Sequence, residues 1–302
     1  MTLLITGATG LVGSEIVSLL LENNHTVHYL TTSKDKIIDK PNYKGFYWNP
    51  KQGVLDESCL NDVEVIIHLA GASVSKRWTS NYKQEIIESR IDTSNLLFKA
   101  LKQHPNQVKQ IVSASAIGIY KDSLTEVYHE DSKQFGDDFL TNVVLKWEES
   151  VDKFSLLHLK VCKLRIGLVL SDKGGALSEM IKPIKLGLGS HFGSGLQMQS
   201  WIHISDLAQM FYFATQNQLE GVYNAVAPNP ATNKALTKSI AKVLNKPLFM
   251  PAIPKFAMQL VLGEMHQLLF SSQNVSSKKI ENQRFEFQFE DLEPALKDLL
   301  NT

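Results

Sequence analysis

Short apolar runs alternate with longer segments of helical periodicity through the first two thirds of the chain. Residues 63–69 form an almost continuous apolar run, which is typical of a parallel strand buried on both faces. Strands that alternate with helices pair in parallel through right-handed crossovers, so the pattern predicts an α/β fold with a doubly wound parallel sheet. Strands are expected at residues 2–6, 26–30, 63–69, 110–114 and 158–164, and helices at residues 11–22, 80–102 and 138–154.

The pattern changes after Leu170, where glycines become frequent. Residues 173–175 and 185–195 form a long glycine-rich region, and long irregular segments of compact domains are usually functional or mobile. We expect a large domain over residues 1–225, of which residues 171–200 contribute to a second lobe, and a small C-terminal domain over residues 226–302. The later elements are expected as a strand and helix at residues 202–214 capped by Ser205 or Asp206, a helix at 236–244 capped by Thr232 or Asn233, a proline linker at 247–254, an amphipathic helix at 255–270 and a strand-like tail at 285–289.

The charges balance: 31 Lys and Arg residues face 31 Asp and Glu residues. A neutral chain has no global field to attract nucleic acid or an anionic membrane. No apolar run approaches the roughly 20 residues that span a bilayer, and the first residues lack the basic segment of a signal peptide. Cys59 and Cys162 are too few for a disulfide framework or a zinc site and are expected as buried, inert thiols. We therefore expect a cytoplasmic protein without metal, nucleic-acid or membrane partners. Whether the chain forms a homodimer is left open.

Three glycines stand between the first strand and the first helix. Gly7, Gly10 and Gly13 have the spacing G-x-x-G-x-x-G. In a dinucleotide site one glycine permits the tight turn, the next lets the backbone approach a diphosphate, and the third lets helix and strand pack closely. The diphosphate then lies at the positive end of the helix. The loop therefore predicts an NAD or NADP site, and the alternative is a glycine-rich turn that binds nothing.

The end of the second strand indicates which dinucleotide is bound. An NAD site usually has Asp or Glu here to hold the ribose 2′-hydroxyl, but this chain has Thr31, Thr32, Ser33 and Lys34. Hydroxyl groups and a lysine can hold a 2′-phosphate, so NADP is favoured. Asp35 lies several residues beyond the strand and keeps NAD as the alternative.

Two further strands end in small or hydroxylated residues. Leu69, Ala70 and Gly71 follow one strand, and residues 113–116, which include Ser113 and Ser115, end another. Ligands of open α/β sheets bind outside the carboxyl ends of the strands, so these residues are expected to border the cofactor. Close packing alone would also explain small residues after Leu69.

At this point the sequence resembles a known family. Residues 6–13, with the sequence TGATGLVG, resemble the extended short-chain dehydrogenase/reductases, the group that contains the sugar-nucleotide epimerases. More specific motifs resemble an atypical branch, the epimerase-family proteins, which has a C-terminal domain of unknown function. These motifs are Leu69-Ala70-Gly71, Lys76-Arg77-Trp78, Ser89-Arg90, Ser113-Ala114-Ser115-Ala116, Leu164-Arg165-Ile166-Gly167, Gly174-Gly175-Ala176, Leu186-Gly187-Leu188-Gly189, Ser200-Trp201-Ile202-His203 and Gly263-Glu264-Met265.

The resemblance covers nearly the whole chain and implies a Rossmann fold, NADP binding and a substrate cleft between the large domain and a small substrate-side lobe. Many relatives have arginine where this chain has Thr32, which weakens the implied grip on a 2′-phosphate. The cofactor contacts implied by position, together with the strand-end residues above, are Gly7, Gly10, Leu11, Val12, Gly13, Thr31, Thr32, Leu69, Ala70, Gly71, Glu85, Arg90 and Ser113.

Typical members of this family use a tyrosine and, four residues later, a lysine for proton transfer. Over residues 138–154 the chain has Asn142 four residues before Lys146, so the expected pair is missing. Ser115 and Tyr120 are the substitutes that the sequence offers as catalytic residues. Their alternative roles are a strand-end hydroxyl that satisfies backbone groups and a packed tyrosine.

A second set of residues is expected at the substrate cleft. His203 either lines the cleft or is a structural hydrogen-bonding group. Arg165 can bind an anionic substrate or pair with a carboxylate, and Asp206 is expected as a helix cap. Two functions remain: an NADP-dependent oxidoreductase or epimerase acting on a small hydroxylated or carbonyl substrate, and an NADP-binding regulator or scaffold without catalysis. The substrate residues are Trp78, Arg165, Gly187, Gly189, Trp201 and His203.

Overall fold

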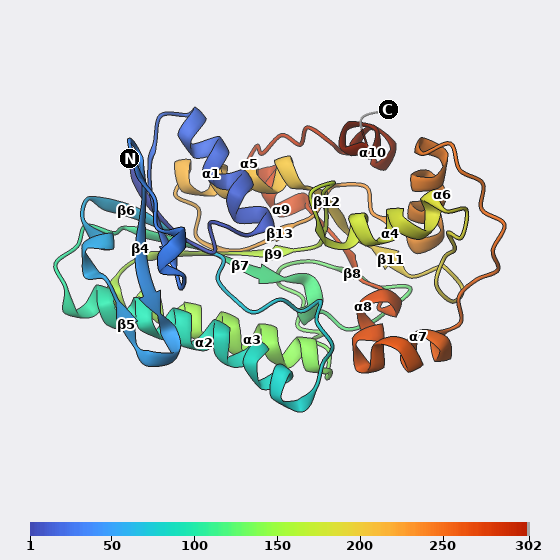
Figure 1. Cartoon of the computed structure of the whole chain (residues 1–302), viewed down its shortest axis with the longest axis horizontal. Helices are drawn as coiled ribbons and strands as arrows, with labels where there is room; N and C mark the ends of the chain where they lie inside the picture. Colours follow the sequence, from blue (N-terminus) through green and yellow to red (C-terminus); the bar gives the residue numbers. More distant parts are fainter. Residues whose placement is uncertain (301–302) are drawn as a thin grey trace.

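A nine-stranded sheet forms the centre of the protein, and the computed structural model describes residues 1–300 (Figure 1). The strand order is β13-β9-β7-β6-β1-β2-β4-β3, with β5 beside β4, and every neighbouring pair from β13 to β4 is parallel. The order reverses between β1 and β6, which confirms the predicted doubly wound sheet. The strands are β1 (Thr2–Thr6), β2 (Thr26–Thr31), β3 (Asp39–Lys40), β4 (Tyr43–Asn49), β5 (Val54–Leu55), β6 (Val63–His68), β7 (Gln110–Ala116), β9 (Lys160–Ile166) and β13 (Gly221–Ala225).

Helices cover both faces of this sheet (Figure 1). α1 and α5 pack together on one face, and α2 and α3 pack together on the other. Each helix turns a stripe of buried residues inward, and on α1 this stripe includes Ile16 and Leu20, one turn apart. These helices are α1 (Leu11–Glu22), α2 (Ser80–Gln103), α3 (Phe139–Asp152) and α5 (Ile204–Gln216).

The second lobe has an apolar core of its own. Trp201 lies fully buried in this core, and its indole nitrogen donates a hydrogen bond to the carbonyl of Asn229 at 2.9 Å. Within residues 1–300 no helix combines the length and the apolar character needed to cross a bilayer. The remaining elements are α4 (Gly175–Lys185), α6 (Asn233–Val243), α7 (Lys255–Leu262), α8 (Gln267–Phe270), α9 (Lys278–Asn282) and α10 (Leu292–Leu300), with the strand pairs β8 (Val127–Tyr128) and β15 (Asn274–Val275), β10 (Leu168–Leu170) and β12 (Trp201–His203), and β11 (Met198–Gln199) and β14 (Ala231–Thr232).

Two predictions for the C-terminal part were wrong. The single helix expected at residues 255–270 is broken at Gly263, which has a φ of 59° and separates α7 from a 3₁₀ turn and α8. The tail at residues 285–289 is not a strand, because the backbone N–H groups of Gln288 and Phe289 donate to the carboxylate of Asp206 at 2.8 and 3.0 Å.

That bond also corrects the expected helix cap. Asp206 is buried and holds the tail instead of capping α5. The N-cap of α5 is His203, whose Nδ1 accepts a hydrogen bond from the N–H of Ser205 at 3.1 Å. Thr232 caps α6 as expected, through its hydroxyl and the N–H of Ala235.

Candidate functional site

The glycine loop lies at the carboxyl end of β1, where the strand order reverses. Gly7 has a φ of 74°, and a Cβ at Gly13 would lie 2.1 Å from the carbonyl oxygen of Gly7, so only glycine fits at Gly13. Gly10 is the N-cap of α1 and offers no side chain to the helix. The first N–H groups of α1, from Leu11 onward, therefore have no partner within the helix, and they form a site for an anion.

Thr6 joins the glycine loop to the neighbouring strand end. Its hydroxyl oxygen accepts hydrogen bonds from the N–H groups of Leu69 and Ala70, both at 3.0 Å, and lies 2.9 Å from Nδ1 of His68. Burial, with a smaller effect from the charge of Arg90, lowers the pKa of His68 to about 4, so this imidazole is neutral at pH 7. The loops after β1 and β6 are thus held side by side, an effect of Thr6 that the sequence analysis did not anticipate.

The end of β2 presents hydroxyl groups and a cation. Thr31 is buried, and its hydroxyl accepts a hydrogen bond from the N–H of Ser33 at 3.2 Å, which turns the chain. Thr32 and Lys34 beyond it are exposed, and Nζ of Lys34 lies 5.2 Å from the centre of the Tyr47 ring. Asp35 is exposed within the 3₁₀ turn Lys34–Lys36. The surface at this strand end suits a phosphate better than a ribose hydroxyl.

Arg90 holds the loop after β6 through contacts with Gly71 and Ala72. Its Nη1 donates to the carbonyls of Ala72 and Ile86 at 3.1 and 2.9 Å, and a Cβ at Gly71 would lie 3.0 Å from the guanidinium carbon. Burial lowers the pKa of Arg90 to about 10, which still leaves it charged at pH 7. Glu85, on the same helix, is half exposed and lies 3.8 Å from Nζ of Lys51.

A buried polar network occupies the carboxyl ends of β7 and β9. The hydroxyl of Ser115 donates to Oε1 of Glu148 at 2.5 Å, and Arg165 donates to the two oxygens of Glu148 from Nε at 2.8 Å and Nη2 at 3.0 Å. Burial alone would raise the pKa of Glu148, but the hydrogen bonds and charge of Arg165 lower it overall, so Glu148 is ionised. The hydroxyl of Ser113, two residues before Ser115 and therefore on the same face of the strand, donates to the carbonyl of Ala114.

Tyr120 extends this network toward β13. Its hydroxyl accepts a hydrogen bond from Nη1 of Arg165 at 2.9 Å and donates to the side-chain oxygen of Asn224 at 2.8 Å. The N–H of Asn224 donates in turn to Glu130 at 2.8 Å. Burial raises the pKa of Tyr120 despite the neighbouring charge of Arg165, so the tyrosine is poorly suited to release a proton near neutral pH. Glu148, Asn224 and Glu130 were not anticipated, because no local motif indicates a partner that is distant in sequence.

The residues of the missing proton-transfer pair point away from this network. Asn142 and Lys146 are both exposed on α3, whereas Val144, Trp147 and Glu148 are buried. In this arrangement the only ionisable side chain that α3 directs at the end of β7 is Glu148.

The predicted substrate residues make contacts within the protein. The indole N–H of Trp78 donates to the carbonyl of Val74 at 2.8 Å, and its ring packs edge-on against Phe139. The ring of His203 lies 4.0 Å from that of Phe289 between centres, in a tilted arrangement, and burial lowers the pKa of His203. Trp201 lies in the core of the second lobe, as described above.

The two glycines after α4 have structural roles. Gly187, with a φ of 75°, directly follows Leu186, the C-cap of α4, and its N–H donates to the carbonyl of Ile184 at 3.0 Å. The N–H of Leu188 donates to the carbonyl of Pro183 at 2.9 Å, which completes a Schellman motif. A Cβ at Gly189 would lie 2.5 Å from the Ile184 side chain, so this glycine allows close packing.

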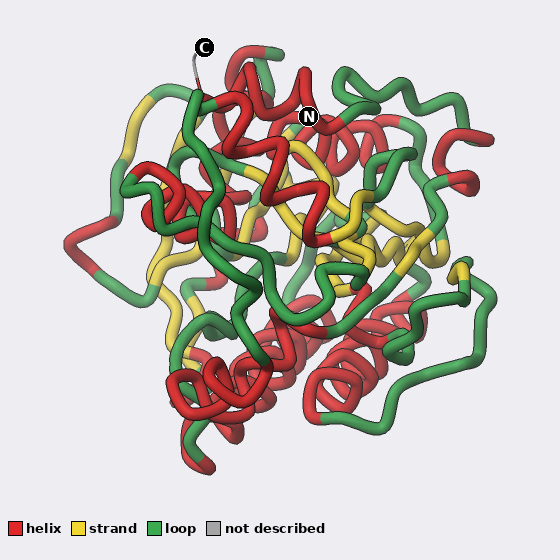
Figure 2. The backbone as a smooth tube through the Cα atoms, turned by 90° about the vertical axis from the view of Figure 1, so that its right-hand side faces the viewer, coloured by secondary structure: helices red, strands yellow, loops and turns green. Residues whose placement is uncertain are grey.

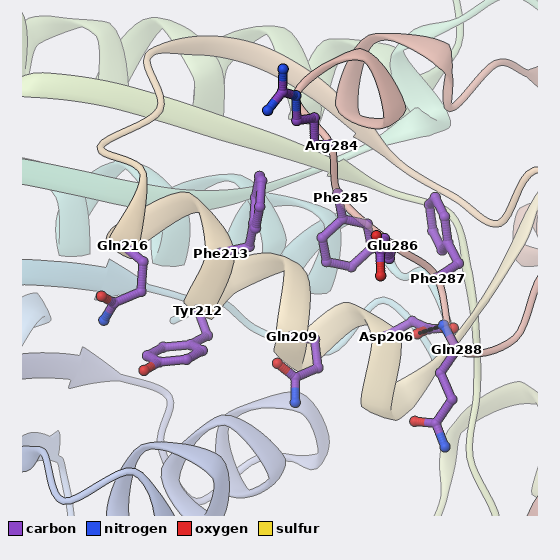
Figure 3. A pocket seen from close by; sticks show the side chains of 10 residues that line it. All are labelled: Asp206, Gln209, Tyr212, Phe213, Gln216, Arg284, Phe285, Glu286, Phe287 and Gln288. Atoms are coloured by element: carbon purple, nitrogen blue, oxygen red, sulfur yellow. Dashed lines mark hydrogen bonds between the residues drawn. The ribbon is translucent and has the colours of Figure 1, made fainter.

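A groove of about 550 Å³ lies away from this edge of the sheet (Figure 3). It runs between α5 and the tail, where Phe213 packs edge-on against Phe285. Tyr212 also lines the groove. Its hydroxyl oxygen lies 3.2 Å from Nε2 of His25, the residue that directly precedes β2. The groove therefore extends toward the amino ends of the strands, opposite to the ends that bind ligands in open α/β sheets.

Comparison with known proteins gives matches over nearly the whole chain. The NAD dependent epimerase/dehydratase family matches residues 3–226, and a domain of unknown function, DUF1731, matches residues 253–299. An epimerase family protein of Staphylococcus aureus strain MW2 is 36% identical, with 98% of each chain covered. The crystal structure of the human epimerase family protein SDR39U1 (isoform 2) with NADPH is similar at a TM-score of 0.86 and 30% identity, with 100% of both chains covered. A nucleoside-diphosphate sugar epimerase from Corynebacterium glutamicum is similar at a TM-score of 0.80 and 30% identity, over 99% of this chain and 58% of that one.

Proposed function

Because the chain belongs to the NAD-dependent epimerase/dehydratase family, we propose that it is an NADP-dependent oxidoreductase or epimerase that acts on a small hydroxylated or carbonyl substrate. The observation that carries this proposal is the N-terminus of α1, where Gly10 supplies no capping side chain and the first N–H groups are free to bind an anion. It lies at the point where the strand order reverses. The NADPH in the human relative supports the choice of cofactor. A bound nicotinamide dinucleotide supplies hydride transfer, and the protein supplies binding and orientation.

The residues of the site fit such a cofactor. The glycine loop leaves space beside the N–H groups of Leu11 and Val12, which have no hydrogen-bond partner within residues 1–300 and would hold the diphosphate. Thr32 and Lys34 would hold the 2′-phosphate, because both are exposed at the end of β2 and no acid occupies this strand end. Leu69 and Ala70, which Thr6 fixes next to the glycine loop, would border the adenosine.

Ser115 is the residue that we assign to orienting the substrate. Its proton is held by the ionised Glu148, so the lone pairs of its oxygen remain to accept a hydrogen bond from a substrate hydroxyl. Arg165 gives two of its nitrogens to Glu148 and a third to Tyr120, so we assign it to holding Glu148 in place and not to binding an anionic substrate. Tyr120 supports the same arrangement from the side of β13.

A catalytically degenerate, NADP-binding regulator or scaffold is the second candidate. Two features of α3 favour it: Asn142 stands in place of the usual tyrosine, and Lys146 is exposed. This helix therefore offers no tyrosine–lysine pair for proton transfer. The polar network behind Ser115 favours the enzyme, because a protein that only senses the cofactor has no need of an oriented hydroxyl beside it.

The cofactor assignment predicts that NADPH binds at least about tenfold more tightly than NADH. Replacing Lys34 with alanine should lower the affinity for NADPH about tenfold and leave that for NADH unchanged, because only the 2′-phosphate gains from the cation. Calorimetric titration measures both affinities. Lys40→Ala removes the same charge from an exposed site on β3 and should change neither. Equal affinities for the two cofactors would contradict the assignment.

The enzyme assignment predicts that Ser115→Ala lowers kcat about 10²–10³-fold and leaves the affinity for NADPH unchanged, because only the hold on the substrate hydroxyl is lost. The assay follows NADPH absorbance with a panel of sugars, sugar nucleotides and smaller hydroxylated or carbonyl compounds. Ser150→Ala is the matched control, since this buried hydroxyl on α3 donates only to the carbonyl of Trp147. Absence of turnover with every compound, while NADPH binds normally, would favour the scaffold.

A further inference from the structure

Helix α7 is almost entirely apolar and yet has no buried residue. Phe256 is 68% exposed and Leu260, one turn later, is 79% exposed, with Val261 beside it. A helix with apolar residues on nearly all sides is normally buried. The exposed surface of α7 therefore indicates a contact that a single copy of the chain does not provide.

Neighbouring segments extend this apolar surface. Phe249, in the loop before α7, is 81% exposed, and Leu186 and Leu188 after α4 are also exposed. The two segments are joined, since the hydroxyl of Ser190 donates to the carbonyl of Pro251 at 2.6 Å. The loop between α6 and α7 runs along the end of the molecule that faces the viewer in Figure 2. We call this surface the lobe tip; its residues are Leu186, Leu188, Phe249, Phe256, Leu260 and Val261.

The lobe tip belongs to a cationic part of a neutral chain. The segments of the second lobe, residues 171–200 and 226–302, contain twelve Lys and Arg residues and nine acidic residues, a formal charge of +3, so the rest of the chain carries −3. Glu264 and Glu179 of this part are paired with Lys83 and Lys182. The three lysines that lie in sequence beside the apolar residues are exposed and have no acidic partner within residues 1–300; they are Lys185, Lys246 and Lys255.

We propose that the lobe tip docks on an anionic lipid bilayer, with its apolar side chains at the headgroup boundary and its lysines on the lipid phosphates. Apolar residues flanked by lysines are the combination that binds such an interface. A symmetric contact between two copies would bring the lysines of both tips together, which opposes it.

This proposal revises an expectation drawn from the net charge. A chain of zero charge was expected to have no attraction to an anionic membrane, but the charges are separated in sequence between the cationic lobe segments and the rest of the chain. Screening limits the action of charges to about 8–10 Å at physiological ionic strength, so the local charge at the tip decides the interaction.

Co-sedimentation of the full chain with vesicles tests the proposal. Vesicles of phosphatidylcholine and phosphatidylglycerol should bind at least about tenfold more protein than vesicles of phosphatidylcholine alone, and added salt should weaken the binding. Both the double variant F256S/L260S and the double variant K246E/K255E should lower binding about tenfold, because one removes apolar contact and the other removes attraction.

Leu156→Ser is the matched control, because Leu156 is 72% exposed but lies in the turn after α3, outside the lobe. Leu156→Ser should bind vesicles as well as the unaltered chain does. All the variants should melt at the same temperature as the unaltered chain, since the altered residues are exposed. Equal binding to both kinds of vesicle, or no binding to either, would overturn the proposal. So would a dimer seen by light scattering that F256S/L260S dissociates, because the tip would then contact a second copy.

Discussion

Replacing Gly10 with glutamate is expected to lower the affinity for NADPH at least about a hundredfold while the protein stays folded. Gly10 is exposed and has a φ of −82°, which any residue adopts, and a Cβ there would lie 3.2 Å from its nearest neighbour, the carbonyl oxygen of Gly7. A carboxylate at this N-cap would occupy the space beside the unpartnered N–H groups of α1 and repel the diphosphate. Calorimetric titration with NADPH measures the loss.

The position of the added charge, not the charge itself, should cause this loss. Ser18→Glu adds a carboxylate to the exposed face of the same helix, two turns beyond Gly10, and should leave the affinity nearly unchanged. The melting temperature of Gly10→Glu should stay within a few degrees of that of the unaltered protein. Gly13 would be a poor choice for this test, since its Cβ would clash with the loop backbone at 2.1 Å. Unaltered NADPH affinity in Gly10→Glu would refute the assigned diphosphate site.

The sequence predicted those parts of the fold in which local pattern and tertiary environment agree. α1 and α2 are long and periodic, and β1 is a short apolar run that ends at the glycine loop; the observed bounds of all three follow the expected ones closely. The sequence did not predict β4, because its residues Tyr43–Asn49 include a glycine and polar residues, which interrupt the apolar pattern of a strand. Gly45 is needed there because a Cβ would lie 2.5 Å from the ring of Tyr29 on the neighbouring strand, which only the assembled sheet shows.

The candidate site divides in the same way. The glycine loop could be predicted because all its requirements lie within about a dozen residues, in the order strand, turn and helix. The network at Glu148 could not, since its partners Ser115 and Arg165 meet only through the parallel pairing of β7 with β9, in which these two residues lie opposite each other. The alternation at residues 285–289 was misleading for a related reason: the backbone groups of Gln288 and Phe289 find a side-chain carboxylate instead of a strand.

The same network gives the largest expected effect on stability. Glu148→Ala should lower the free energy of unfolding by about 3–5 kcal/mol, because it leaves the buried guanidinium of Arg165 without its bidentate partner. Denaturation in urea measures the change. Glu179→Ala removes a carboxylate from an exposed pair with Lys182 and should cost less than about 1 kcal/mol.

A double variant separates the loss of the pair from the burial of an unpaired charge. Glu148→Met combined with Arg165→Met should recover much of the stability lost in Glu148→Ala, because two apolar side chains of similar volume need no partner. A double variant no more stable than Glu148→Ala would show that the network stabilises the fold through more than this pair.

The contribution of Glu148 should also depend on pH in a defined direction. Its pKa is lowered in the folded protein, so the stabilisation is fully present above the ordinary value of 4.5 and is lost as the pH falls through the lower folded value. The difference in unfolding free energy between the unaltered protein and Glu148→Ala should therefore be constant near neutral pH and shrink in acid below that value. Urea denaturation across this range measures it. A difference that persisted undiminished in acid would mean that Glu148 stabilises the ends of β7 and β9 by packing and not by its charge.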